Sequence, residues 1–309
     1  MAPLTEMDNS YMYFGCLVTF LKLVRFMEGP NPVSGIVDED GVHIYDVLGS
    51  DPFGEYLLLH DVDETSLEAF LEAMIEGRTP RTYRHDWLER QFIMPIIPSE
   101  VWAAGVTYKR SVDAREDETD VKGIYDMVYE SERPEILFKG LGYRTVGPNS
   151  VICIRSDANW NVPEPEFTLV YAEKRIVGYM IGNDVSSRDI EGANPLYLPQ
   201  AKVFQNSCAI GPYLVTKDEV EEPKNIGIRL IIQREGEVVF SGETSTSNMK
   251  RGFEELTDHL FRDNPVPRGS IMLTGVGVVP PDDFTLQDGD FVEISMDGLG
   301  TMRNYVKQL

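Results

Sequence analysis

The chain has 309 residues, of which 42% are hydrophobic, and this is enough apolar material for a large core in one or two domains. Lysine and arginine number 28 against 51 aspartates and glutamates, so the formal net charge is −23. A protein this acidic is a poor candidate for binding nucleic acid by phosphate neutralisation. No apolar run approaches the roughly 20 residues of a membrane-spanning helix. Neither nucleic acid nor a membrane is therefore expected as a partner.

The first third of the chain predicts a small α+β domain behind an N-terminal extension. Residues 64–76 have helical periodicity, because the apolar side chains recur on one face. The proline-bounded segment 93–98 marks the expected domain boundary. Strands are expected over residues 21–26, 33–37 and 42–47. The predicted units are an extension over residues 1–20, a small α+β domain over 21–93 and a catalytic domain over 94–309.

Three carboxylates surround a predicted β-hairpin in the middle of the chain. Residues 167–172 and 176–181 are strand-like, with a short polar turn between them. Glu164 and Glu166 stand just before the first strand, and Asp184 stands just after the second. A hairpin brings its outer ends together, and residues i and i+2 of an extended chain face the same side. The three acids are therefore expected to converge at one end of the hairpin.

This convergence predicts a divalent-metal site. Carboxylates held close together repel one another, and a hard cation relieves the repulsion. An all-oxygen ligand set selects Mg²⁺, Mn²⁺ or Ca²⁺, and an incomplete set leaves positions for water and substrate. We predict Mg²⁺ as the cofactor, with Mn²⁺ as the alternative and Ca²⁺ able to take the site in crystals. The competing interpretation is a solvated acidic rim on a very acidic protein.

The last third of the chain is predicted to be rich in strands. An amphipathic stretch over residues 249–261 is the main helix expected there. Many strands with one or two helices, and no alternation of strand and helix, predict a β-rich α+β fold. Strands are expected over residues 226–233, 238–241, 271–279 and 291–296.

The central motif resembles the fumarylacetoacetate hydrolase superfamily, whose members carry a Glu-x-Glu pair and a following Asp, in a segment like GNDVSSRD (residues 182–189), as metal ligands. The likeness covers roughly the last two thirds of the chain. It implies Glu164, Glu166 and Asp184 as ligands and a mixed β-sandwich roll, often dimeric or tetrameric. Further matching runs are PLYLPQAK (195–202), CAIGPYLVT (208–216), TGVG (274–277) and GDFVEISMDGLGTMRN (289–304).

One departure from the superfamily bears on the reaction. Its carbon–carbon hydrolases show a pattern like GLNYxxHxxE, whose His and Glu activate water. Here Ser111 stands at the His position and Ala114 at the Glu position. Neither side chain takes a proton from water near neutral pH. This departure argues against hydrolysis and favours a reaction without attack by water.

Within the superfamily, the chain is most similar to members that dehydrate 2-keto-3-deoxy sugar acids. The glutamate matching Glu135 lies in their active site and is implicated in proton transfer, which implies Glu135 as an acid or base. The similar runs are VWAAGVTY (101–108), RPEILFK (133–139), VPEPE (162–166), NPLYLPQAK (194–202) and RDNPVP (262–267).

Lys202 is the second expected catalytic residue, because the superfamily has a lysine there that faces the metal-bound substrate. Such a lysine binds a substrate oxygen or acts as a base, with a Schiff base ranked lower and a plain salt bridge as the structural alternative. The resemblance also implies Tyr108, Ser111 and Thr274 as substrate contacts. The hydroxyl of Thr274 and its close backbone approach are expected to hold the substrate carboxylate.

Together these residues predict a Mg²⁺-dependent lyase acting on a 2-keto-3-deoxy sugar acid such as 2-keto-3-deoxy-D-arabinonate. The expected route is a metal-stabilised enolate followed by loss of the C4 hydroxyl. One alternative is an acylpyruvate or fumarylpyruvate-type C–C hydrolase, or a 2-oxo-acid decarboxylase or isomerase, on the same site. Another is a non-catalytic protein that binds a metal and a 2-keto acid.

Cys16, Cys153 and Cys208 form an odd, scattered set, which fits a reduced cytoplasmic setting. A homodimer or homotetramer is expected.

Overall fold

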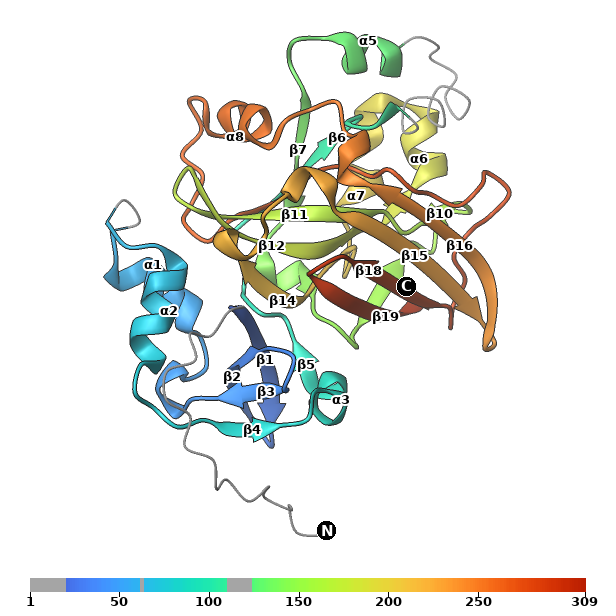
Figure 1. Ribbon diagram of the computed structural model, residues 1–309. Helices are drawn as coiled ribbons and strands as arrows, with labels where there is room; N and C mark the ends of the chain where they lie inside the picture. The colour runs from blue at the N-terminus through green and yellow to red at the C-terminus, as the bar shows by residue number, and fades with distance from the viewer. Residues whose placement is uncertain (1–20, 62–63, 110–123) are drawn as a thin grey trace.

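The computed structural model describes residues 21–61, 64–109 and 124–309 (Figure 1). Within these residues, twelve strands form one sheet, five form a second and two form a short ladder. The helices are few and short, which matches the predicted β-rich α+β class. None of the described helices is both long and apolar enough to cross a membrane.

The N-terminal part forms four antiparallel strands beside two helices, at the lower left of Figure 1. Ser66 is the N-cap of α2 (Leu67–Ile75), and its hydroxyl accepts a hydrogen bond from the Ala69 N–H, which satisfies one of the free donors of the first turn. The helices bury aromatic and aliphatic side chains, including Phe53, Tyr56 and Phe70. The elements are β1 (Lys22–Glu28), β2 (Asn31–Val37), β3 (Val42–Ile44), α1 (Pro52–Leu59), α2 (Leu67–Ile75), β4 (Arg81–Tyr83), α3 (His85–Leu88) and β5 (Phe92–Ile93).

These strands continue the main sheet, because β1 pairs with β14 (Cys208–Thr216). The sheet order is β4-β3-β2-β1-β14-β12-β11-β17-β6-β7, with β5 beside β1 and β8 beside β14. The predicted domain boundary between residues 93 and 94 lies between β5 and β6, which belong to the same sheet. The division into two domains therefore stays a prediction. The remaining members are β6 (Val101–Gly105), β7 (Glu135–Gly140), β8 (Thr145–Val146), β11 (Pro165–Ala172), β12 (Arg175–Asp184) and β17 (Ile271–Leu273).

The predicted central hairpin is confirmed as β11 and β12, which pair antiparallel in the middle of the main sheet. Glu173 and Lys174 make the turn, and Glu173 has a φ of 55°. Every residue of β11 is buried. The register pairs Pro165 with Asn183, and the Asp184 N–H donates to the Glu164 carbonyl at 2.9 Å. This register brings the acids at the two outer ends of the hairpin together.

The second sheet packs face to face with the hairpin. Phe167 and Leu169 of β11 share one buried cluster with Leu230, Ile232 and Ile294 of the second sheet. The result is a sandwich whose shared core fixes the position of β11 and β12. The second sheet has the order β16 (Glu237–Ser245), β15 (Gly227–Arg234), β18 (Phe291–Met296), β19 (Gly300–Gln308) and β9 (Val151–Ile154).

Some predicted elements are shorter in the structure. The strand expected over residues 271–279 ends at Leu273, because the backbone turns at Gly275 with a φ of 100°. The strand expected over residues 42–47 ends at Ile44. The helix expected from residue 249 begins at Phe253. The other elements are α5 (Ile124–Glu130), β10 (Asn161–Val162), β13 (Ser186–Ser187), α6 (Arg188–Ala193), α7 (Leu198–Lys202) and α8 (Phe253–Phe261).

Candidate metal centre and active site

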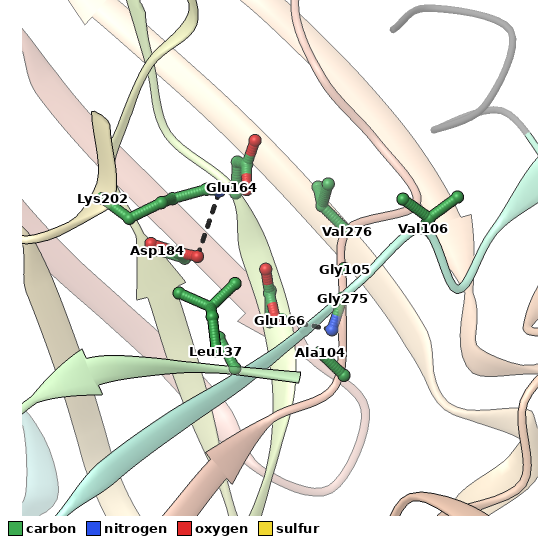
Figure 2. Close-up of a pocket in the computed structure, with 11 residues that line it drawn as sticks. Ala104, Gly105, Val106, Leu137, Glu164, Glu166, Asp184, Lys202, Gly275 and Val276 are labelled. Carbon is green, nitrogen blue, oxygen red and sulfur yellow. Dashed lines mark hydrogen bonds and ion pairs between the residues drawn. The ribbon is translucent and has the colours of Figure 1, made fainter. Parts of the chain in front are cut away.

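Three buried carboxylates meet at one end of the hairpin (Figure 2). Glu164 immediately precedes β11, Glu166 is its second residue, and Asp184 ends β12. One carboxylate oxygen from each lies within 4.8 Å of the others. All three side chains are buried, with at most 2% of each residue exposed. The interpretation as a solvated acidic rim is therefore wrong.

Lys202, at the end of α7, contacts two of these carboxylates. Its Nζ donates to Glu164 Oε2 at 2.6 Å, to Asp184 Oδ2 at 3.1 Å and to Ser186 Oγ at 2.6 Å. Only 2% of the residue is exposed. The sequence placed Lys202 beside the metal-site carboxylates, and the structure brings it there.

Two further buried cations contact the same acids, and neither was among the predicted site residues. Arg188 Nε donates to Glu164 Oε1 at 3.0 Å, and a second guanidinium nitrogen lies 2.9 Å from the same oxygen. Lys139 forms an ion pair with Asp184 Oδ1. Both residues stand inside motifs already noted, namely GNDVSSRD and RPEILFK. Buried cations are rare unless they are paired, so their burial, which only the structure shows, singles them out.

Glu166 is held differently from the other two acids. Its Oε2 accepts a 2.5 Å hydrogen bond from the Gly275 N–H. Burial, followed by the nearby charges of Asp184 and Glu164, raises the pKa of Glu166 well above its usual value. A divalent cation between the three acids would offset this repulsion and allow all three to ionise. An all-carboxylate donor set of this kind fits Mg²⁺ or Mn²⁺.

A small cavity of about 10 Å³ lies against the carboxylates, with space on the order of one water molecule. In the view of Figure 2, Lys202 lies on one side of the acids, and Gly105 and Gly275 lie on the other. The apolar part of the wall consists of Ala103, Ala104, Val106, Leu137 and Val276.

Glu135 lies beside this cavity at the start of β7. It pairs in register with Gly105 of β6, which lines the cavity. A Cβ atom added to Gly105 would lie 2.2 Å from Glu135 Oε2, so the carboxyl group occupies the space above this glycine. The structure therefore brings Glu135 to the edge of the site, on a different element from Lys202.

The three predicted substrate contacts are Tyr108, Thr274 and Ser111, and the structure describes the first two. Tyr108 is 1% exposed, and its hydroxyl has no hydrogen-bond partner among the described residues. Burial and the nearby charge of Glu166 raise the Tyr108 pKa. The Thr274 hydroxyl donates to the Phe167 carbonyl at 2.7 Å, and the residues after it, not Thr274, line the cavity. Its role as a substrate contact stays a prediction. Ser111, like Ala114, lies outside the described residues.

Comparison with known proteins identifies relatives over most of the chain. The family model for the C-terminal part of fumarylacetoacetate (FAA) hydrolase matches residues 130–307. A Haloferax volcanii protein named "Probable 2-keto-3-deoxyxylonate dehydratase" is 42% identical over 85% of this chain and 91% of its own length. The 2-dehydro-3-deoxy-D-arabinonate dehydratase of Saccharolobus solfataricus is 44% identical over 69% of this chain and 74% of its own length.

Solved structures agree with these sequence relatives. A 2-keto-3-deoxy-D-arabinonate dehydratase complexed with magnesium and 2,5-dioxopentanoate superposes with a TM-score of 0.77 and is 34% identical. The match covers 94% of this chain and 99% of that one. The apo form of an enzyme of the same name gives a TM-score of 0.78 at 36% identity, over 94% of this chain and 99% of that one.

Proposed function

Because the chain belongs to the fumarylacetoacetate hydrolase family, we propose that its buried carboxylate site dehydrates a 2-keto-3-deoxy sugar acid with the help of Mg²⁺. The observation that carries the proposal is the buried set of Glu164, Glu166 and Asp184 beside Lys202. The relatives that are 42% and 44% identical over the aligned residues are named as dehydratases of such acids. The sequence-based prediction of a metal-dependent lyase agrees with them.

A 2-keto-3-deoxypentonate is the substrate favoured by these relatives. Such an acid keeps no stereocentre at C2 or C3, so only C4 distinguishes one pentonate from another. Derivatives of D-arabinonate and D-xylonate have the same configuration at C4 and are therefore one compound. The two relatives' names give different parent sugars but are consistent with one and the same substrate.

Glu164, Glu166 and Asp184 are the residues that would hold the cation. When bound, Mg²⁺ supplies Lewis-acid stabilisation of the negative charge that develops on the substrate's keto oxygen as C3 loses a proton. The buried guanidinium of Arg188 and the ammonium of Lys202 keep the carboxylates oriented through their hydrogen bonds. The apolar wall beside them limits access of water.

We assign the proton transfers to Lys202 and Glu135. One group takes a proton from C3, and the other protonates the C4 hydroxyl, which leaves as water while a C3–C4 double bond forms. Transfer of a proton from C5 to C3, and of the C5 hydroxyl proton to C4, then gives the 2,5-dioxo acid. The buried hydroxyl of Tyr108 lies near Glu166 and is available as a donor to a substrate oxygen.

The test is turnover by purified protein, with Mg²⁺ and after chelation, followed by NMR in D₂O. The panel contains 3-deoxy-2-keto pentonates, the corresponding hexonates and acylpyruvates. We expect Mg²⁺-dependent conversion of the pentonate to 2,5-dioxopentanoate, with deuterium incorporated at C3. Cleavage of acylpyruvates without dehydration would instead identify a C–C hydrolase. Saturable binding without any exchange of the C3 proton would identify a binding protein.

We also propose a cytoplasmic homodimer or homotetramer. Cys153 and Cys208 are buried and free, which supports a reducing compartment. Light scattering coupled to size exclusion measures the oligomeric state directly, and a monomeric mass would contradict this part of the proposal.

A further inference from the structure

Lys139 is a buried cation of β7 that contacts the metal centre without lining the cavity. Its side chain is 0% exposed, and the Asp184 side chain beside it is 2% exposed. A lysine is almost never this buried unless its charge is paired. The ion pair with Asp184 Oδ1 supplies that pairing.

The ammonium of Lys139 is fully committed to the protein. It donates to the Val185 carbonyl at 3.1 Å and to the Lys202 carbonyl at 2.5 Å, and it forms the ion pair with Asp184 Oδ1. Two of its three N–H donors are therefore used by backbone carbonyls, and its charge is paired with Asp184. Any effect of Lys139 on the reaction must therefore pass through the groups that it holds.

Two of those groups belong to the proposed active site. Asp184 is held at both oxygens, since Oδ1 pairs with Lys139 and Oδ2 accepts from the Lys202 ammonium at 3.1 Å. Lys139 also binds the backbone carbonyl of Lys202, at the C-terminal end of α7. One side chain thus links the end of β12, the end of α7 and β7.

We propose that Lys139 is a positioning residue, which fixes the Asp184 carboxylate and the backbone that carries Lys202 in one relative geometry. The expected effect of Lys139 on turnover rests on the proposed function, whereas its expected effect on metal binding does not. Groups that orient metal ligands typically contribute about 10–100-fold to metal affinity or activity.

A purely electrostatic role predicts the opposite effect on metal binding. A positive charge beside the carboxylates repels a divalent cation, so its removal would strengthen binding. Loss of a positioning group leaves Asp184 free to rotate and would weaken binding. The sign of the change therefore distinguishes the two roles.

The experiment compares Lys139→Met and Lys139→Gln with the wild-type protein. Lys139→Met removes the charge and all three donors. Lys139→Gln also removes the charge, but its amide keeps two N–H donors for the two carbonyls. Lys174→Met is the matched control, because Lys174 is 60% exposed and pairs with Asp258 at the surface. Free Mn²⁺ is measured by electron paramagnetic resonance, and folding is checked by circular dichroism.

We expect Lys139→Met to weaken Mn²⁺ binding by about 10–100-fold and Lys139→Gln to weaken it less. At saturating Mg²⁺, kcat should fall while KM changes by less than about threefold, because Lys202 is displaced and the cavity wall is intact. Lys174→Met should match the wild type.

Unchanged or tighter Mn²⁺ binding in a folded Lys139 variant would overturn the proposal. If Lys139→Met does not fold, the Mn²⁺ affinity and the kinetic constants of Lys139→Gln test the proposal instead. Failure of the wild type to dehydrate any substrate would count against the proposed function alone, since the Mn²⁺ measurement does not depend on turnover.

Discussion

The backbone N–H of Gly275 donates a 2.5 Å hydrogen bond to Glu166 Oε2. Gly275 has a φ of 100°, a conformation that residues with a side chain rarely adopt. A Cβ atom at this position would lie 2.0 Å from Thr107 Oγ1. The close approach of this loop to Glu166 therefore depends on the absence of a side chain.

We predict that Gly275→Ala weakens Mg²⁺ binding at least about tenfold, because the loop must move away and Glu166 loses its donor. Isothermal titration calorimetry measures the affinity. Gly289→Ala is the control: Gly289 also has a positive φ of 88°, but an added Cβ would meet nothing within 4 Å. Equal losses in both variants would show that backbone strain, and not the clash with Thr107, causes the effect.

The raised pKa of Glu166 predicts that metal binding strengthens with rising pH. A carboxyl group must be deprotonated to ligate a metal, so the proton on Glu166 competes with the cation. Burial and the charges of Asp184 and Glu164 favour the protonated form, which extends the competition above the usual range of a glutamate. Mn²⁺ affinity should keep rising with pH above the usual pKa of a glutamate, about 4.3, and much less so in Glu166→Gln. A flat profile in the wild type would contradict this assignment.

Local sequence was sufficient to predict the convergence of the three acids. A strand, a polar turn and a second strand define a hairpin, and residues at its outer ends must meet. The contacts of Lys139 were not predictable in this way. Lys139 and Asp184 are far apart in the sequence, and they meet only because β7 packs against α7, which in turn packs against β13, just after the end of β12. Likewise, one strand was predicted over residues 271–279, whereas the strand ends at Leu273 and the backbone turns at Gly275, which has a φ of 100°.

Glu135 should be required for turnover but not for metal binding. Its carboxyl group lies above Gly105 and belongs to none of the metal-ligand contacts. We expect Glu135→Gln to lower kcat by at least about 100-fold, the usual loss for a proton-transfer group, with Mg²⁺ affinity within about threefold of the wild type. Steady-state kinetics and calorimetry measure the two effects.

A second variant tests the position of Glu135 rather than its chemistry. Gly105→Ala adds a Cβ in the space of the Glu135 carboxyl group, 2.2 Å from Oε2, and should lower kcat in the same direction. For Glu135→Gln, the matched control is Glu132→Gln, which alters an exposed glutamate three positions earlier and should leave kcat unchanged. Full activity in Glu135→Gln would show that Glu135 takes no part in the mechanism.

A separate acidic cluster, away from the metal centre, should make stability depend on pH. Burial, a hydrogen bond that the protonated Glu68 carboxyl donates to Asp218, and the charges of Asp218, Glu219 and Glu72 raise the pKa of Glu68 to about 7. A carboxyl pKa raised by folding contributes stability that is complete below the usual pKa and is lost as pH rises through the raised value. Glu68 should therefore stabilise the protein near pH 5 and lose this contribution by about pH 8.

Glu68→Gln keeps the side chain neutral at every pH and so avoids this loss. We expect its Tm to exceed that of the wild type by about 1–2 °C at pH 8 and to match it near pH 5. Glu55→Gln, which removes an exposed glutamate from α1, controls for the change in net charge. If Glu55→Gln raises Tm at pH 8 by the same amount, the gain reflects the overall charge of −23 and not the contact between Glu68 and Asp218. A gain confined to Glu68→Gln locates the pH dependence in the packing of α2 against the segment that carries Asp218.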